Sequence, residues 1–252
     1  MSAPVRLIYE SKNFLAVNKP AGLLVHGTRT MEHETTHTPS SKFYGPGKEP
    51  TLVDWLLRRY PEIRNVGDNP QGRPGIVHRL DKATSGVVLV ARNQNYFNYL
   101  KSLFQKRTIA KTYVALVHGK LKSRTGTVDT PIAIKRGSVK RTVHSGKMLK
   151  DAITDYTVVK YLNGEGGASY SLVEVRPRTG RTHQIRVHLS SIGHPVVGDV
   201  LYGGKARRKA QSVQRLMLHA LSLEFTTRRG RRLKLEAEPP REFLDAVARL
   251  EG

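Results

Sequence analysis

The sequence predicts an α+β fold built on a mixed, largely antiparallel sheet. Short apolar segments alternate with polar turns, and few helical segments lie between them. Strands joined by short turns pair in antiparallel fashion, whereas parallel strands need long crossover connections. With 252 residues, of which 38% are hydrophobic, the chain is long enough to bury a large core. No clear linker interrupts it, so we expect one domain over residues 1–252.

The elements of the first half follow from apolar spacing. We expect strands at 7–9, 14–17 and 86–91 and helices at about 51–57 and 93–107. Thr51 is a suitable residue to cap the first helix. Residues 27–50 hold few apolar side chains and many Thr, Ser, Gly, Pro and His. They predict a long loop, and loops of that length are usually functional or disordered.

The second half continues the pattern of strands. We expect strands at 113–117, 155–162, 170–175, 218–225 and 233–237 and a closing amphipathic helix at 241–250. Residues 163–167 (NGEGG) predict a hairpin turn. They do not predict a phosphate-binding loop, because no helix follows them.

Charge is the strongest compositional signal. Lys and Arg number 43 against 20 Asp and Glu, which gives a formal charge of +23. The excess is clustered in residues 135–150, 205–209 and 228–234, and we expect 135–150 to form a basic loop. Solvated surface loops or an acidic membrane are alternatives, but membrane binding favours a basic amphipathic helix with bulky apolar residues opposite. Clustered positive charge instead favours a nucleic acid as the partner.

The chain has no cysteine, which excludes disulfides, Cys-based zinc sites and thiol nucleophiles. It has ten histidines, but His183 and His188 are five residues apart and do not share one helix face. We therefore expect no metal site. No apolar run approaches the roughly 20 residues of a membrane helix, and no signal peptide is visible. A cytoplasmic protein is the expectation.

A first group of polar residues lies in 75–86 (GIVHRLDKATSG), between apolar residues on both sides. Asp81 is thereby held on a tight connection that emerges from a buried sheet, next to the cations Arg79 and Lys82. Such a scaffold fixes the position of a reacting group. The alternative is an Asx-turn in which Asp81 caps its own loop.

A second group lies in 178–189 (RTGRTHQIRVHL). Gly180 permits a sharp turn, and Thr182 can cap a helix that runs to about residue 192. Ile185 and Leu189 would face the core, while Gln184 and His188 would share another face. Arg181, at the start of this helix, is the natural candidate to pair with a buried carboxylate.

Five segments together resemble the RluA family of pseudouridine synthases. HRLDKATSGVVLVA (78–91) is similar to the catalytic motif and NKPAGLLVH (18–26) to the N-terminal motif. KTYVALVHG (111–119) resembles the strand that carries the active-site tyrosine. TGRTHQIRVHLSSIGHPVVGDVLYG (179–203) and RLMLHALSLEF (215–225) resemble the third motif and a strand near the C-terminus. We expect the chain to lack the S4-type RNA-binding module that often precedes the catalytic domain in this family.

The resemblance implies the synthase fold, in which helices flank a sheet with a central RNA-binding cleft. It implies that Asp81 is the catalytic carboxylate, that Tyr113 stacks on the uracil, and that Arg181 pairs with Asp81. Lys19 and Pro20 would support the Asp81 loop. Met217 and Leu218 would form the apolar wall behind the base, and Arg79 would fill the gap left by a flipped base. The residues expected to contact RNA are His78, Arg79, Met217, Leu218, Lys135, Arg136, Lys140 and Arg141.

The implied reaction isomerises uridine to pseudouridine, without a cofactor because nothing is oxidised or hydrolysed. Asp81 would trap C1′ covalently, as in retaining glycosidases, or remove a C2′ proton, and both routes stay open. Ribosomal and transfer RNA are both possible substrates, and we expect a monomer. A catalytically silent RNA-binding protein, such as a ribosome assembly factor, is the alternative. A sugar-cleaving enzyme is disfavoured because the motifs hold no second carboxylate.

Overall fold

The computed structural model describes residues 4–27, 49–138, 140–144, 146–205, 213 and 215–250. Most of the predicted loop at 27–50 and most of the basic cluster at 205–209 lie outside these residues. Among the described residues, no helix is long and apolar enough to cross a membrane.

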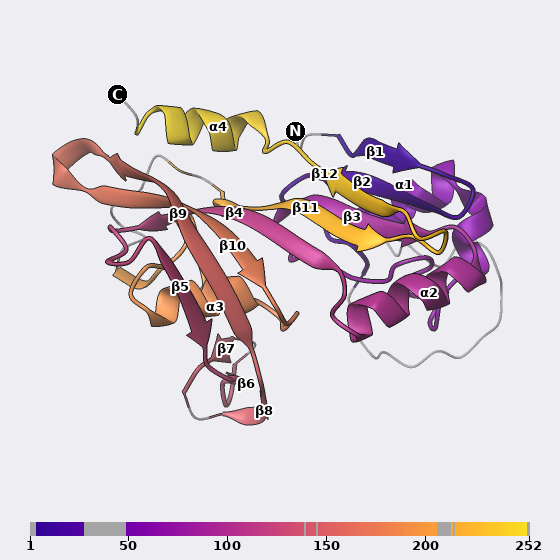
Figure 1. Ribbon diagram of the computed structural model, residues 1–252, viewed down its shortest axis with the longest axis horizontal. Helices are drawn as coiled ribbons and strands as arrows, with labels where there is room; N and C mark the ends of the chain where they lie inside the picture. Colours follow the sequence, from indigo (N-terminus) through magenta and orange to yellow (C-terminus); the bar gives the residue numbers. More distant parts are fainter. Residues whose placement is uncertain are drawn as a thin grey trace.

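A nine-stranded sheet runs through the protein in the order β1-β2-β3-β11-β4-β10-β9-β5, with β12 paired to β11 (Figure 1). Its strands are β1 (Arg6–Glu10), β2 (Phe14–Lys19), β3 (Ser85–Ala91), β4 (Ala110–His118), β5 (Thr125–Asp129), β9 (Ile153–Asn163), β10 (Ser169–Pro177), β11 (Leu218–Thr226) and β12 (Arg232–Glu236). The β3–β11 pair is parallel, and the other pairs of this sheet are antiparallel. The predicted α+β class with a mixed, largely antiparallel sheet is confirmed.

Helices flank the sheet on both sides (Figure 1). They are α1 (Leu52–Arg59), α2 (Gln94–Gln105), α3 (Gln184–Ser191) and α4 (Arg241–Ala248), with short 3-10 turns at η1 (Pro61–Asn65) and η2 (Glu165–Gly167). The Thr51 cap is confirmed, because its side chain accepts from the Asp54 amide while Asp54 accepts from the Thr51 amide. In Figure 1, α2 lies below the strands on the right and α4 lies above the sheet, while α3 lies beside β9 and β10.

Two local predictions need correction. The helix of the second group begins at Gln184, and His183 rather than Thr182 is its N-cap, in the left-handed conformation with φ 58°. The basic segment 135–150 is not a simple loop. Together with β6 (Ile132–Ile134) it forms a small antiparallel sheet of order β7-β6-β8, in which β7 is Arg141–Thr142 and β8 is Lys147–Lys150.

The small sheet is held against α3 by apolar contacts, because Ile132 and Val187 share a buried cluster. The apolar positions expected on α3 are confirmed, since Ile185 and Leu189 are both buried. Gln184 and His188 share another face as expected, and both hydrogen-bond the hydroxyl of Thr154.

Within the described part of the chain, the one parallel pair of the large sheet depends on a glycine. Gly86 pairs with Ala220 of β11 at φ +123°, and a Cβ atom there would lie 2.2 Å from the Ala220 carbonyl oxygen. Only glycine permits so close an approach of two backbones. Next to it, the Ser85 hydroxyl bonds His219 Nδ1 at 2.8 Å and accepts from Arg215 at 2.8 Å. These contacts fix the start of β3, directly after the Asp81 loop.

Candidate active site

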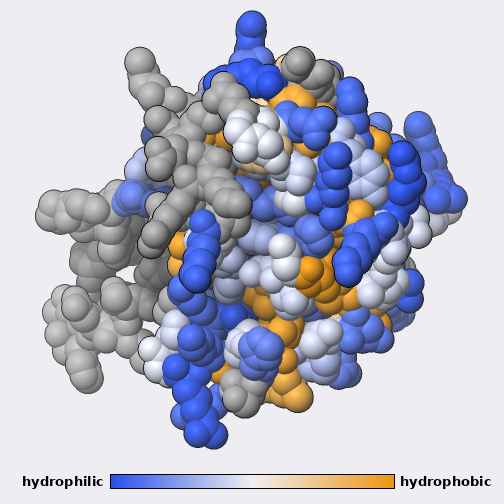
Figure 2. All heavy atoms as spheres, turned by 90° about the vertical axis from the view of Figure 1, so that its left-hand side faces the viewer, coloured by the Kyte–Doolittle hydropathy of each residue, from blue (hydrophilic) through white to orange (hydrophobic). Residues whose placement is uncertain are grey.

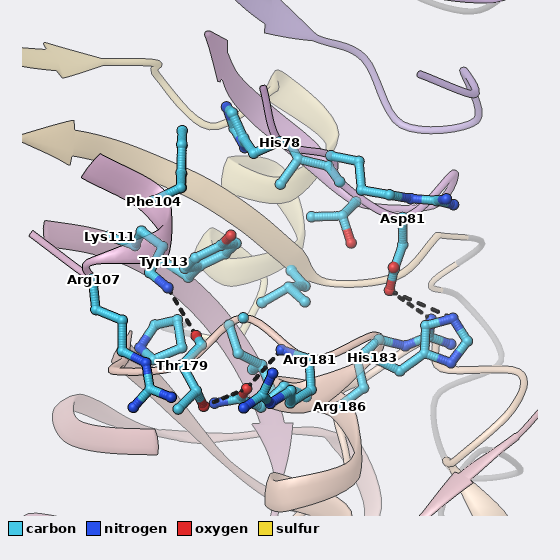
Figure 3. A pocket seen from close by; sticks show the side chains of 18 of the residues that line it. His78, Asp81, Phe104, Arg107, Lys111, Tyr113, Thr179, Arg181, His183 and Arg186 are labelled. Atoms are coloured by element: carbon cyan, nitrogen blue, oxygen red, sulfur yellow. Dashed lines mark hydrogen bonds and ion pairs between the residues drawn. The ribbon is translucent and has the colours of Figure 1, made fainter. Parts of the chain in front are cut away.

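A pocket of about 460 Å³ lies against β4 and β11, two adjacent strands of the large sheet. Its walls come from the loop before β3, the end of α2, β4, and the segment leading into α3. Figure 3 shows Asp81 on one side of this pocket, pointing toward His183 and Arg186. Tyr113, Lys111 and Arg107 lie on the other side. The two groups predicted from the sequence therefore meet at one pocket.

The Asp81 loop is tied down by the N-terminal strand. Lys19 is fully buried, and its Nζ donates to the carbonyls of Pro20 at 2.9 Å, Leu23 at 2.8 Å and Lys82 at 3.2 Å. Burial lowers the pKa of Lys19 to about 7, although the charge of Asp81 acts in the opposite direction. The Gly22 amide also donates to the Lys82 carbonyl, at 2.8 Å. The expected support of the loop by Lys19 and Pro20 is present.

Asp81 pairs with Arg186 and not with Arg181. Arg186 Nη1 donates to Asp81 Oδ2 at 3.0 Å, while its Nε and Nη2 form a bidentate pair with Asp199 at 2.7 and 2.8 Å. The side chain of Arg186 is only 5% exposed, and that of Asp199 is fully buried. The pKa of Asp199 is lowered. Burial by itself would raise it, but the hydrogen bonds and the charge of Arg186 outweigh burial.

The predicted pairing of Arg181 is wrong because of where the helix begins. Arg181 precedes α3, its amide donates to the Gln184 side chain at 2.9 Å, and its Nε donates to the Asp151 carbonyl at 2.9 Å. Arg186 lies within α3 and points at the pocket. The sequence did contain a signal for this role. Arg186 stands between the apolar residues Ile185 and Val187, which are both buried, and a cation in such a place requires an acidic partner.

His183 is a site residue that sequence reasoning missed. Its Nε2 lies 3.8 Å from Asp81 Oδ2, and its Nδ1 bonds the Tyr202 hydroxyl at 2.8 Å. Burial lowers its pKa, with opposing contributions from Asp81, which raises it, and Arg186, which lowers it. The ring therefore stands beside the carboxylate in its neutral form. Among the described residues, no three His, Cys, Asp or Glu side chains gather as metal ligands would.

Tyr113 and Leu218 line the pocket as expected, from the adjacent strands β4 and β11. Burial, and then the charge of Asp81, raise the pKa of the Tyr113 hydroxyl well above its ordinary value. Met217 is not part of the pocket wall, which corrects the prediction. It is fully buried in the core between β4, β10 and α3, because neighbouring residues of an extended segment point to opposite sides.

His78 and Arg79 also line the pocket, in different environments. His78 Nε2 accepts from the Leu89 amide at 2.9 Å, and its ring stacks on Phe104 with centroids 4.6 Å apart. Burial and the charge of Lys111 lower the pKa of His78 to about 3, so the ring is neutral. Arg79 is exposed and approaches His26 at 3.4 Å.

Known proteins of similar sequence share one family. The family model described as RNA pseudouridylate synthase matches residues 13–191. The chain belongs to this family. It is 38% identical over 255 residues to an uncharacterized RNA pseudouridine synthase of Aquifex aeolicus, covering 98% of this chain and 73% of that protein. It is 34% identical over 244 residues to the ribosomal large subunit pseudouridine synthase D of Borreliella burgdorferi, covering 96% and 67%.

Solved structures give the same family. Human RNA pseudouridylate synthase domain containing 1 superposes with a TM-score of 0.73 at 28% identity, covering 94% of this chain and 84% of that one. Human RNA pseudouridylate synthase domain containing 4 gives 0.72 at 26% identity, covering 97% and 92%. The protein is thus an RNA pseudouridine synthase, an isomerase, and the predicted family, activity and RNA substrate class are confirmed.

The small sheet carries the four basic residues that were expected to contact RNA. Lys135 and Arg136 are exposed in the turn that follows β6, and Lys140 precedes β7. The amide of Arg141 donates to the Tyr202 hydroxyl at 2.8 Å, which joins this sheet to the group around Asp81. Figure 2 faces the end of the molecule that carries β5, β9 and the small sheet, and much of this face is hydrophilic.

Proposed function

We propose that this synthase isomerises uridines of large-subunit ribosomal RNA, with Asp81 as the catalytic carboxylate. The supporting observation is the position of Asp81: it stands in the pocket, 3.0 Å from a buried arginine and across from Tyr113. The ribosomal substrate is supported by relatives named ribosomal large subunit pseudouridine synthase D. Transfer RNA is the other substrate that the same chemistry would accept.

In the proposed reaction, the C1′–N1 bond of uridine breaks, the uracil turns, and C5 bonds to C1′. The proton on C5 is then lost and N1 gains a proton, so the product is an isomer of uridine and no oxidant or reductant is needed. Positive charge develops at C1′ as the first bond breaks, and an adjacent carboxylate stabilises or traps it. Arg186 holds Asp81 in place and compensates its charge. A bidentate pair with Asp199 keeps Arg186 in turn from rotating away.

A uridine within a stem reaches this pocket only after flipping out of the helix. We propose that exposed Arg79 occupies the gap and that Leu218 forms the apolar wall behind the base. Tyr113 would stack on the uracil and accept the C5 proton directly or through water. Its raised pKa means that the hydroxyl is protonated in the resting pocket. It would therefore pass its own proton to a water molecule in the pocket as it accepts the C5 proton.

Tyr113→Phe tests the hydroxyl separately from the ring. The stacking surface remains, so RNA affinity should stay within about twofold, whereas kcat should fall by about 10²–10⁴, the usual contribution of a general acid or base. Single-turnover assays with saturating enzyme measure the chemical step directly. Normal turnover by this variant would remove the hydroxyl from proton transfer and leave only stacking.

The proposed function itself is tested by tritium release. RNA labelled at C5 of uridine should lose tritium to water in proportion to pseudouridine formed, and large-subunit ribosomal RNA from cells lacking the gene should be the preferred substrate. Sequencing that detects pseudouridine then locates the position. Tight binding without release from any RNA would instead favour the silent RNA-binding alternative.

The basic segment provides a separate test of RNA binding. Replacing Lys135, Arg136, Lys140 and Arg141 together by Gln should weaken binding and flatten its dependence on salt. The slope of log K against log salt should fall by about 0.7–0.9 for each phosphate that the variant no longer binds. Filter binding at several salt concentrations measures this slope. A slope equal to that of the wild type would show that the small sheet points away from the RNA.

We also propose that the chain acts as a monomer with one catalytic domain over residues 1–252. In support of one domain, the nine-stranded sheet takes its strands from both halves of the chain, from β1 to β12, and residues of both halves line the pocket. A cytoplasmic location is proposed from the RNA substrate.

A further inference from the structure

Three cations gather on the side of the pocket that faces Asp81. They are Arg107 at the end of α2, Lys111 on β4, and Arg181 before α3, and all three line the pocket (Figure 3). Among the residues that the structure describes, none of the three forms an ion pair with an acidic side chain. Arg186 on the other side has two carboxylate partners. Positive charge is therefore left uncompensated on this side.

Backbone contacts hold two of the cations in place. Lys111 Nζ donates to the Thr179 carbonyl at 2.8 Å, and Arg181 Nε donates to the Asp151 carbonyl at 2.9 Å. Burial, together with the charges of Arg107 and Arg181, lowers the pKa of Lys111 to about 8. Like charges held this close repel one another, and an anion bound between them would remove that cost.

Arg107 reaches this place in a strained conformation. It ends α2 with φ 59°, its amide donates to Phe104, and the next amide, of Thr108, donates to Leu103. This pattern is a Schellman cap, in which the left-handed position is usually glycine. Among the described residues only Arg107, Met148 and His183 are non-glycine residues with positive φ, and two of these three line the pocket. Strain of this kind clusters at functional sites.

We propose that Arg107, Lys111 and Arg181 form a phosphate subsite that binds the RNA backbone beside the flipped uridine. This inference rests on the proposed action on RNA. Two guanidinium groups suit phosphate, because each presents several donors in a planar fork. The subsite fixes the strand at the rim while Asp81 acts on the ribose from the opposite side. Arg181 thereby gains a role in binding in place of the predicted pairing with Asp81.

Arg107→Gly separates binding from folding. Glycine accepts the left-handed conformation without strain, so the thermal midpoint should equal or exceed that of the wild type. RNA affinity at 0.15 M salt should fall about threefold to tenfold, and the salt slope should decrease by about 0.7, the value for one phosphate contact in a single strand. The probe is a transcript of large-subunit ribosomal RNA, assayed by filter binding. Arg107→Lys, which keeps the charge, should retain the wild-type slope.

Arg241→Ala is the matched control. Arg241 is exposed on α4, above the sheet in Figure 1, so removing its charge should leave affinity and slope unchanged. A wild-type slope for Arg107→Gly, or a lowered thermal midpoint, would overturn the phosphate subsite. A loss of kcat at saturating RNA with unchanged affinity would also overturn it, because the cations would then act on the cleaved uracil. These binding measurements do not depend on turnover. Failure of the proposed reaction would instead be seen in a separate experiment, as the absence of tritium release by the wild type.

Discussion

Replacing Asp81 by Asn should reduce pseudouridine formation below detection while leaving RNA binding nearly intact. The change keeps the size of the side chain and its hydrogen bonding, but removes the negative charge and the nucleophilic or basic oxygen. Affinity should stay within tenfold, or about 1.4 kcal/mol, because binding depends mainly on cations that contact phosphate. Tritium release from C5-labelled RNA, run beside filter binding, measures both quantities.

The structure makes the folded state of this variant easy to verify. Arg186 loses one of its two carboxylate partners but keeps the bidentate pair with Asp199, so the thermal midpoint should change little. Tritium release by Asp81→Asn at the wild-type rate would end the Asp81 mechanism. An Asp81→Asn protein that fails to fold would be recognised by the absence of a thermal transition, and Asp81→Ser would then serve as the second variant.

Arg186→Met should impair both activity and stability. Asp81 loses the cation that orients it, and fully buried Asp199 loses its partner. Removing one member of a buried pair costs about 3–5 kcal/mol, because the remaining charge stays uncompensated. Single-turnover rates should fall by at least 10²-fold even at temperatures where the variant is fully folded. Denaturant unfolding measures the loss of stability.

The stability effect should depend on pH with a definite sign. The pKa of Asp199 is lowered in the folded protein, so the pair contributes stability above the ordinary carboxyl pKa of about 3.9. That contribution is lost as the pH falls through the lowered value. The difference in the free energy of unfolding between the wild type and Arg186→Met should therefore be largest near pH 7 and become smaller at acid pH. A difference that stays constant down to acid pH would show that the loss comes from packing and not from charge.

Arg178→Met is the matched control for Arg186→Met. Arg178 also forms a bidentate pair, with Asp155 at 2.6 and 2.9 Å, but its side chain is 61% exposed. Exposed ion pairs contribute about 0–1 kcal/mol. The same substitution should therefore have little effect on stability or rate at this position. A loss as large as that of Arg186→Met would mean that burial is not what makes the Arg186 pair important.

Local patterns in the sequence predicted most of the fold. The run 86–91 is buried as β3, the Thr51 cap begins α1, and the NGEGG turn joins β9 to β10. The position of Asp81 on a loop leaving the sheet was also predictable, because apolar residues flank it on both sides. Each of these features depends on residues close together in the chain.

The partner of Asp81 was not predictable in the same way. Arg181 and Arg186 are five residues apart and both line the pocket, and the point at which α3 begins decides which of them pairs with Asp81. That start is set by His183 in a left-handed conformation, which is unusual for a residue other than glycine. The role of Asp199 and the position of Tyr202 depend on packing between distant segments. Spacing along the chain does not report such contacts.

The parallel pairing of β3 with β11 has a consequence for the order of folding during synthesis. Gly86 and Ser85 are anchored by Ala220, His219 and Arg215, about 130 residues later in the chain. Contacts between such distant segments form late, since the ribosome must first release the second one. The Asp81 loop is thus translated early but fixed only near the end of translation. A nascent chain that stops before β11 should carry the motif and still be unable to act on RNA.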